Sequence, residues 1–376
     1  MDNKVSKRAS LIQIIIFCLF ITGIFISNLV IPSRDFSEQE NRYLQKLPTL
    51  SMKDLASGAF TKNFENYVMD QFVLRDSWTA MKARAELALG KKENNDVYLS
   101  SDGTLIERYE KPDYKMVDAN IAAVNRLAET AGVPVYFALV PGVPEIWRGK
   151  LVPDAPNYSQ AELISYIYEK AQPTTIDMYS ALEANSSEYI FYKTDHHWTT
   201  LGAYYGYEKL AGDLGLSPSP LSSYARRTVS DEFYGTVYSS SGFSWVEPDS
   251  IEIFVEPGEN IEVTNFPTGS PVEGKLYDES FLEKKDKYSM FMGGNTPKLQ
   301  ITTGNPGGKI LILRDSFMDS LTPFLLEHYS EIHLLDLRYY ILSVHDYIGQ
   351  NDIDTVLVCY SVSNFASDVK VYLAGQ

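Results

Sequence analysis

Short apolar segments alternate with amphipathic ones along most of the chain after residue 115. The apolar segments with the length of buried strands are residues 133–141, 309–313, 331–336 and 354–360. Near-continuous apolar runs are typical of parallel strands covered on both faces. The segments with helical spacing are residues 116–131, 161–171, 318–329 and 344–350. This alternation predicts an α/β fold, in which helices flank a parallel sheet.

Other patterns fill in the rest of the chain. Residues 53–89 carry apolar side chains at helical spacing, which predicts a helical region. Residues 189–192 form a short apolar run, which we interpret as a short strand. From about residue 217 to 306, serine, tyrosine, glycine and proline dominate, with alternating pieces such as residues 250–255. This composition predicts a β-rich insertion of antiparallel strands and loops.

The N-terminus has the pattern of a membrane anchor. Basic residues precede an apolar run over residues 11–31, which is long enough to cross a bilayer as a helix. Acidic residues follow the run, so residues 1–10 should stay in the cytoplasm and the remainder should lie outside. A cleaved signal peptide is the alternative. We favour a transmembrane signal-anchor, then a connector and helical region at residues 32–95 and an α/β domain at residues 96–376.

The composition limits the classes of partner. A hydrophobic content of 44% is ordinary for a globular protein that buries a sizeable core. The formal net charge is −16, from 49 acidic and 33 basic residues. Binding to nucleic acid requires basic patches that contact phosphates, so we predict no nucleic-acid partner.

The candidate chemistry lies in Asp195-His196-His197-Trp198, which holds two of the five histidines. Ser316 follows much later, where a predicted strand meets a predicted helix. Acyl transfer by serine needs a base for the hydroxyl and an acid that orients the base. In an extended segment or loop, Asp195 and His197 share a face and can supply both. The pattern indicates a Ser-His-Asp triad, although helix capping by Asp315 or Ser316 is a simpler interpretation.

A metal site is the competing interpretation of the same residues. Asp195, His196 and His197 are all possible ligands, but a further ligand is not evident. Adjacent histidines are also expected to point apart. We therefore predict no metal and no cofactor.

Ligands on parallel sheets gather at the carboxyl ends of the strands. Ser316, Arg338 and Asn364 each follow the end of a predicted strand. We expect Asn364 to donate a hydrogen bond to an oxyanion. We expect Trp198 to form a wall of the site or part of the core, and we assign it to the site.

Several of these segments resemble one protein family. Residues 194–199 (Thr-Asp-His-His-Trp-Thr) look like the signature of the DHHW family, which is similar to the alginate O-acetyltransferase group of periplasmic proteins. Further similar segments are residues 36–42, 70–76, 315–317 and 336–339. The resemblance covers most of the chain after the apolar run.

The resemblance implies an SGNH-hydrolase-like fold. Its blocks would be circularly permuted, because Asp195 and His197 precede the serine block here. It also implies that Ser316 is the nucleophile, His197 the base and Asp195 the orienting acid. The Asp-x-His spacing agrees with the alginate acetyltransferase group.

Three further residues are assigned by position within that resemblance. Asn364 falls where the oxyanion asparagine of the third block would lie. Arg338 or Tyr339 falls where the second block would lie. Arg314 stands where ordinary SGNH enzymes have a glycine before Asp-Ser, so we expect it to line the site and to affect how closely a substrate approaches.

The function that the resemblance implies is O-acetylation of a cell-surface or secreted polysaccharide in a bacterial envelope. The enzyme would be anchored in the cell membrane and would form an acyl-serine intermediate. A membrane-bound O-acyltransferase partner would donate the acetyl group, because one span cannot bring acetyl-CoA across the bilayer. Two alternatives remain open: a polysaccharide acetyl esterase with the same triad, and a non-catalytic glycan-binding or scaffold subunit of a polysaccharide modification complex.

Overall fold

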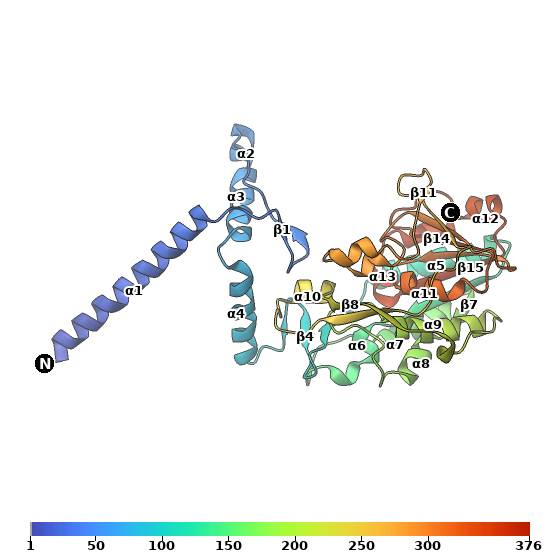
Figure 1. Cartoon of the computed structure of the whole chain (residues 1–376), viewed down its shortest axis with the longest axis horizontal. Helices are drawn as coiled ribbons and strands as arrows, with labels where there is room; N and C mark the ends of the chain where they lie inside the picture. Colours follow the sequence, from blue (N-terminus) through green and yellow to red (C-terminus); the bar gives the residue numbers. More distant parts are fainter. Residues whose placement is uncertain (1) are drawn as a thin grey trace. The chain divides into compact units, whose positions relative to one another are not determined.

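The computed structural model describes the backbone of residues 2–376 and the side chains from residue 7 onward. The chain divides into two compact units (Figure 1). The first comprises residues up to Lys91 together with Gly242–Trp245. The second comprises Lys92–Ser241 and Val246–Gln376.

The first unit is mostly helical. Its elements are α1 (Asp2–Val30), β1 (Phe36–Ser37), β2 (Arg42–Tyr43), α2 (Met52–Ser57), α3 (Ala59–Asp70) and α4 (Arg75–Ala88). Within α1, the segment Lys7–Val30 is long and apolar enough to cross a membrane. The predicted N-terminal apolar helix is therefore present.

Ion pairs hold the connector of the first unit against its helices. The Arg42 guanidinium donates to both oxygens of Asp70, at 2.9 and 2.6 Å. Arg75 is paired with Glu40. The backbone N–H of Val73 donates to the side chain of Asn28 at the end of α1, at 2.9 Å. These contacts give the polar connector a defined path.

A single mixed sheet forms the centre of the second unit. In spatial order its strands are β11 (Val272–Glu273), β10 (Glu262–Asn265), β12 (Lys298–Thr302), β14 (Glu331–Leu335), β13 (Lys309–Arg314), β15 (Thr355–Ser361), β6 (Val135–Val140) and β7 (Thr174–Ile176). The five strands from β14 to β7 are parallel. The predicted α/β fold with a parallel sheet is confirmed, and three antiparallel strands extend it at one edge.

The alternation of side chains along each strand builds two separate cores. On β13, Ile310 and Ile312 point to one core, and Leu311 and Leu313 point to the other. The first core is covered by α8 (Met178–Ala184), α9 (Thr200–Asp213) and α11 (Phe317–Leu325). The second is covered by α5 (Tyr114–Thr130), α7 (Gln160–Lys170), α12 (Val344–Gln350) and α13 (Val362–Ser367). Because both faces are buried, the strands read as continuous apolar runs.

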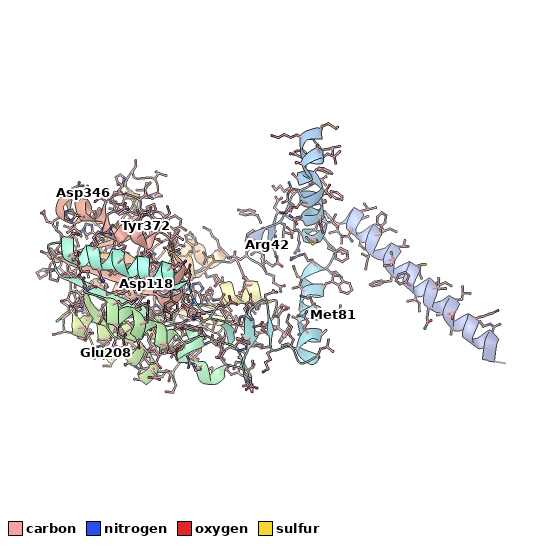
Figure 2. All side chains as sticks on the ribbon, turned by 180° about the vertical axis from the view of Figure 1, so that it is seen from behind. Arg42, Met81, Asp118, Glu208, Asp346 and Tyr372 are labelled. Atoms are coloured by element: carbon pink, nitrogen blue, oxygen red, sulfur yellow. The ribbon has the colours of Figure 1, made fainter. Side chains whose placement is uncertain are left out.

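Two of the helices that cover the sheet, α5 and α9, expose polar side chains. Asp118 on α5 and Glu208 on α9 point away from the sheet (Figure 2). These two helices are thus amphipathic, whereas every residue of α11 is buried.

The segment predicted as an insertion consists of antiparallel strands and loops. It contains the hairpin of β8 (Arg227–Phe233) and β9 (Asp249–Ile253), with α10 (Thr236–Ser241) between them. Its other strands, β10, β11 and β12, join the central sheet. A separate small sheet consists of β3 (Glu93–Asn94), β4 (Val97–Leu99) and β5 (Leu105–Glu107).

The prediction of a strand at residues 189–192 was wrong. Only Phe191 pairs there, in an isolated bridge with Trp198. Ile190 accepts a hydrogen bond from the backbone N–H of Thr199 at 3.0 Å, which closes a tight reversal of the chain. The apolar character of this run reflects burial, since Ile190, Phe191 and Tyr192 are fully buried.

Candidate active site

Ser316 lies where β13 passes into α11, at the carboxyl end of a central parallel strand. Asp315 fixes this turn to the neighbouring strand. It accepts hydrogen bonds from the backbone N–H groups of Phe317 (3.0 Å) and Ser361 (2.8 Å) and from the side-chain amide of Asn364 (2.8 Å). Ser316 itself is only partly buried, so its hydroxyl is accessible from outside the sheet.

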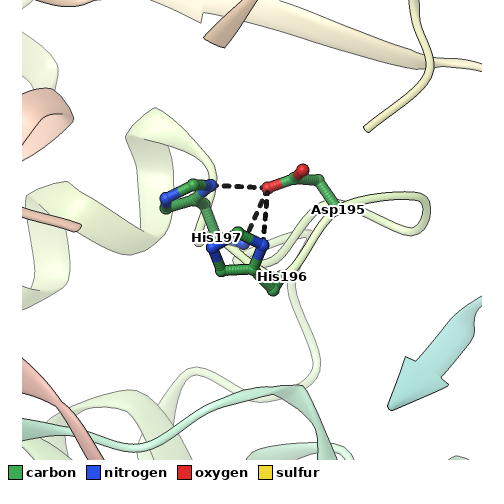
Figure 3. Close-up of side chains that lie close together, drawn as sticks. All are labelled: Asp195, His196 and His197. Carbon is green, nitrogen blue, oxygen red and sulfur yellow. Dashed lines mark hydrogen bonds and ion pairs between the residues drawn. The ribbon is translucent and has the colours of Figure 1, made fainter. Parts of the chain in front are cut away.

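His197 and Asp195, the candidate base and its candidate acid, lie in an irregular segment before α9. Nε2 of His197 is 2.8 Å from Oγ of Ser316. Nδ1 of His197 is 2.6 Å from Oδ1 of Asp195, which also accepts the backbone N–H of His197 at 3.0 Å (Figure 3). One continuous chain of hydrogen bonds therefore joins serine, histidine and aspartate.

Residues from the insertion hold the aspartate in place. The backbone N–H and the hydroxyl of Thr236 donate to Oδ2 of Asp195, at 2.8 and 3.0 Å. Asp249 accepts the backbone N–H groups of Lys193 and Thr194, both at 2.8 Å. At Gly235, a Cβ atom would lie 2.2 Å from Cβ of Asp195, so this position has no room for a side chain.

The electrostatic environment favours a charged Asp195 and a neutral His197. Burial alone would raise the pKa of Asp195, but the charges of His196 and His197 and the hydrogen bonds from His197 and Thr236 hold this pKa far below its usual range. Burial lowers the pKa of His197, and the neighbouring His196 lowers it further, whereas Asp195 opposes both effects. His197 is therefore neutral near pH 7 and can accept a proton.

Tyr288 packs flat against the base. Its ring is stacked on that of His197, with centroids 3.8 Å apart and planes 8° apart. Its hydroxyl donates to the carbonyl oxygen of Ser316 at 3.1 Å. The side chain is buried, and it joins the histidine to the serine turn.

His196 does not point away from His197, contrary to the expectation for adjacent histidines. The two rings lie 3.9 Å apart, and both face Asp195 (Figure 3). Nδ1 of His196 is 2.7 Å from the Thr236 hydroxyl. The possible ligand atoms of Asp195, His196 and His197 lie within 4.8 Å of one another, so these side chains could hold a cation. A cation there would compete with His197 for the Asp195 carboxylate.

Trp198 and Arg314 do not line the site, which corrects the prediction for both. Trp198 is fully buried, and its Nε1 donates to the Phe317 carbonyl and to Ser320, both at 2.9 Å. Arg314 is also fully buried and is paired with Asp319 at 2.8 Å. Both side chains are therefore part of the buried interior.

The other predicted residues have separate places. Asn364 lies beside the serine turn and lines the adjoining cavity. Arg338 donates to the buried Asp336, at 2.6 and 2.9 Å. Tyr339 is half exposed, and neither it nor Arg338 lines the cavity. The structure thus places Asn364 at the site, whereas Arg338 and Tyr339 lie outside the cavity.

Sequence reasoning missed Tyr288, Thr236, Asp249 and Gly235. They come from turns and the first residues of short elements in the insertion, where no periodic pattern marks a functional position. A cavity of about 840 Å³ adjoins the triad. Its lining includes Asp195, His196, Phe317 and Asn364. This volume is sufficient for a ligand of several sugar-sized groups.

Comparison with solved structures identifies the fold. A DHHW family protein from Eubacterium siraeum is 27% identical, with a TM-score of 0.64 over 75% of this chain and 95% of that one. Bacillus cereus PatB1 with a sulfonyl adduct is 23% identical, with a TM-score of 0.62 over 73% of this chain and 97% of that one. A weaker likeness is to the O-acetyltransferase domain of Pseudomonas putida AlgJ, at 15% identity and a TM-score of 0.48, over 72% of this chain and 92% of that one.

No curated protein matches the chain. A family model described as DHHW protein matches residues 95–335, which contain the Asp-His-His-Trp segment and the serine turn. The resemblance found in the sequence is confirmed, and the chain belongs to the DHHW family.

Proposed function

We propose that this protein is an O-acyltransferase that moves an acetyl group to hydroxyl groups of a polysaccharide through Ser316. The observation that carries the proposal is the hydrogen-bonded chain from Ser316 through His197 to Asp195. Such a chain turns a serine hydroxyl into a nucleophile at neutral pH. The motif resemblance to the alginate O-acetyltransferase group supports the choice of acetyl transfer to a glycan.

In the proposed reaction, His197 takes the proton of Ser316 as Oγ attacks the carbonyl carbon of an acetyl ester. The resulting imidazolium is stabilised by the buried Asp195. His197 then returns the proton to the leaving alcohol, and acetyl-Ser316 remains. In the second half, a glycan hydroxyl attacks this ester and His197 takes its proton. The bond between the acetyl carbon and Oγ then breaks, and His197 returns the proton to Oγ of Ser316.

The proposed oxyanion donors lie on both sides of the serine turn. The backbone N–H of Ser316 stands at the start of α11, where the helix dipole favours negative charge. The side-chain amide of Asn364 has two N–H groups, and one of them is bonded to Asp315. We propose that the other supports the oxyanion.

The anchor and the acetyl donor complete the proposal. Lys7–Val30 would cross the cell membrane with the N-terminus inside, which follows from the positive residues before it. The second unit would then face the outside, where acetyl-CoA is absent. A membrane-bound O-acyltransferase partner would supply the acetyl group.

The strand order supports a circular permutation of an SGNH-hydrolase-like sheet. Counted from β13, the parallel strands follow in chain order as β13, β14, β15, β6 and β7. Their spatial order is then second, first, third, fourth and fifth. That is a common order of doubly wound sheets, and the serine follows its first strand. We propose that the family shares this rearranged connectivity.

The test uses the full chain in detergent micelles, with 4-nitrophenyl acetate as donor and chitopentaose as acceptor. Acetylated oligosaccharide detected by mass spectrometry supports the transferase. Release of free acetate alone supports the esterase. Unchanged turnover in the Ser316→Ala chain would exclude both enzymes and leave the scaffold role. The matched control is Ser187→Ala, an exposed serine.

A second readout does not depend on turnover. A sulfonyl fluoride reacts with activated serines, and the PatB1 structure carries a sulfonyl adduct. We expect one adduct on the wild-type chain, located at Ser316 by peptide mapping, and none on Ser316→Ala. Labelling that persists in Ser316→Ala would contradict the assignment of the nucleophile.

A further inference from the structure

The cavity beside the triad has an acidic wall. Its charged lining residues, apart from the triad and His196, are Asp96, Glu107, Arg108, Glu110, Lys111 and Asp113. Carboxylates outnumber cations in this set by two to one. A bound group with negative charge would therefore meet a repulsive field.

Arg108, the arginine of this wall, is neutralised by ion pairs. Its guanidinium is within ion-pair distance of Glu93 (2.8 Å), Asp96 (2.6 Å) and Glu110 (2.9 Å). A cation shared by three carboxylates has little charge left for a ligand. Lys111 is exposed, and its ammonium lies over the ring of Tyr114 at 5.6 Å.

Among the carboxylates of this wall, Glu107 is the one best placed to bind a ligand. It ends β5, where Leu105 and Glu107 line the cavity and Ile106 points into the core. Among residues 7–376, neither a hydrogen bond nor an ion pair joins the side chain of Glu107 to the protein. Glu107 is exposed to solvent. Partial desolvation by the surrounding walls raises the pKa of Glu107, with His196 opposing and Asp195 adding to the effect.

The position of β5 places Glu107 on the triad side of the cavity. The backbone N–H of Leu105 donates to the carbonyl of Lys193 at 2.8 Å, two residues before Asp195. Asp195 and His196 line the same cavity and act electrostatically on Glu107. A ligand held by Glu107 would therefore lie next to the reacting groups.

We propose that Glu107 binds the acceptor glycan through its hydroxyl or amino groups, and that the acidic wall selects glycans without carboxylate or phosphate groups. This inference rests on the proposed function. Glu107 accepts hydrogen bonds from a sugar, whereas an anionic sugar is repelled by the same carboxylate. Glu107 is thus a specificity-determining residue that contacts the acceptor.

The experiment compares acceptors of equal length on the full chain in detergent: chitopentaose, its de-acetylated form, and oligogalacturonate. We expect the wild type to acetylate the first two faster than the uronate. In Glu107→Lys, transfer to the uronate relative to chitopentaose should rise about tenfold, the scale of reversing one charge in a partly solvated cavity. Glu107→Gln should give a smaller shift in the same direction. The control Glu129→Lys, at an exposed position on α5, should leave the ratio unchanged.

A binding measurement separates this inference from the proposed function. Calorimetry of the same three oligosaccharides with the Ser316→Ala chain, with and without Glu107→Lys, reports selectivity without catalysis. If the wild type releases only acetate while binding keeps the predicted order, the transferase fails and the inference stands. If the wild type prefers the uronate, or if Glu107→Lys leaves both ratios unchanged, the inference is overturned.

Discussion

The two halves of the candidate triad are held by different kinds of structure. Ser316 follows a strand that pairs along its length with β14 and β15. Asp195 and His197 lie in a segment with a single isolated bridge, and hydrogen bonds from the insertion hold it. Ser316 is therefore positioned by the sheet, and His197 is positioned by side chains.

This difference predicts how sensitive each half of the candidate triad is to mutation. Many backbone hydrogen bonds and two apolar cores stabilise the sheet. A small change beside Ser316 should therefore move the serine little. The base depends on a few contacts with Thr236, Asp249 and Tyr288. We expect mutations in the insertion to affect catalysis more than their distance in sequence suggests.

The largest expected effect tests whether the two halves act as one unit. His197→Ala and Ser316→Ala should each lower kcat for 4-nitrophenyl acetate by roughly 10³-fold or more. The double variant should lose no more than either single one, because neither group works alone. Steady-state kinetics on the three chains, with Ser187→Ala as control, give the answer. Losses that multiply would show that the halves act independently.

Asp195→Asn should lower kcat by about 10² to 10⁴-fold, because the amide stabilises neither the imidazolium nor the required tautomer. The pH profile sharpens this prediction. The base works when neutral, and burial lowers the pKa of His197 below its ordinary value. Wild-type kcat/KM should thus stay on its plateau at pH 6.5 and fall only as pH drops through that lowered pKa. Asp195→Asn should move the acidic limb to still lower pH, and an unmoved limb would contradict the pairing.

Gly235→Ala tests the side that depends on the insertion. The added Cβ would lie 2.2 Å from the Cβ of Asp195 and must displace the carboxylate. We expect kcat to fall by roughly 10²-fold with little change in KM, since a small misplacement is enough to disrupt proton transfer. Gly212→Ala, in α9 with open space around it, is the matched control. Equal activity in both variants would show that the site tolerates this shift.

The smallest effect concerns Tyr288, which acts through His197 as a positioning residue. Tyr288→Leu removes the stacked ring, and kcat should fall by about tenfold. Tyr288→Phe keeps the ring and loses only the hydrogen bond to the Ser316 carbonyl, so a loss of about twofold to threefold is expected. The imidazole proton resonances of His197 should shift in Tyr288→Leu and stay nearly unchanged in Tyr288→Phe. Identical spectra in both variants would exclude a role for stacking.

The sequence was sufficient to predict the sheet and the location of the serine. Residues 309–313 read as a buried strand because both of their faces pack into cores, and Ser316 stands directly after them. It was not sufficient to show that His197 reaches Ser316, because that contact depends on the packing of α9 against α11. Arg314 and Trp198 were misplaced because adjacency to a site in sequence does not fix the direction of a side chain.

The insertion was the least predictable region. Its strands could be recognised by alternation, yet Tyr288 lies in a single turn of 3₁₀ helix without any repeat. Thr236 and Gly235 act through a backbone N–H and through the absence of a side chain. Neither kind of contribution leaves a chemical signature in a single sequence.

The buried pair of Arg314 and Asp319 has an evolutionary consequence. Removing one member would leave the other charge unpaired in the core and would destabilise the fold by about 3–5 kcal/mol. Replacing both with apolar residues of similar volume would be tolerated far better. During evolution, Arg314 and Asp319 should therefore be substituted nearly together. Relatives that have glycine before Asp-Ser should also lack the carboxylate at the position of Asp319.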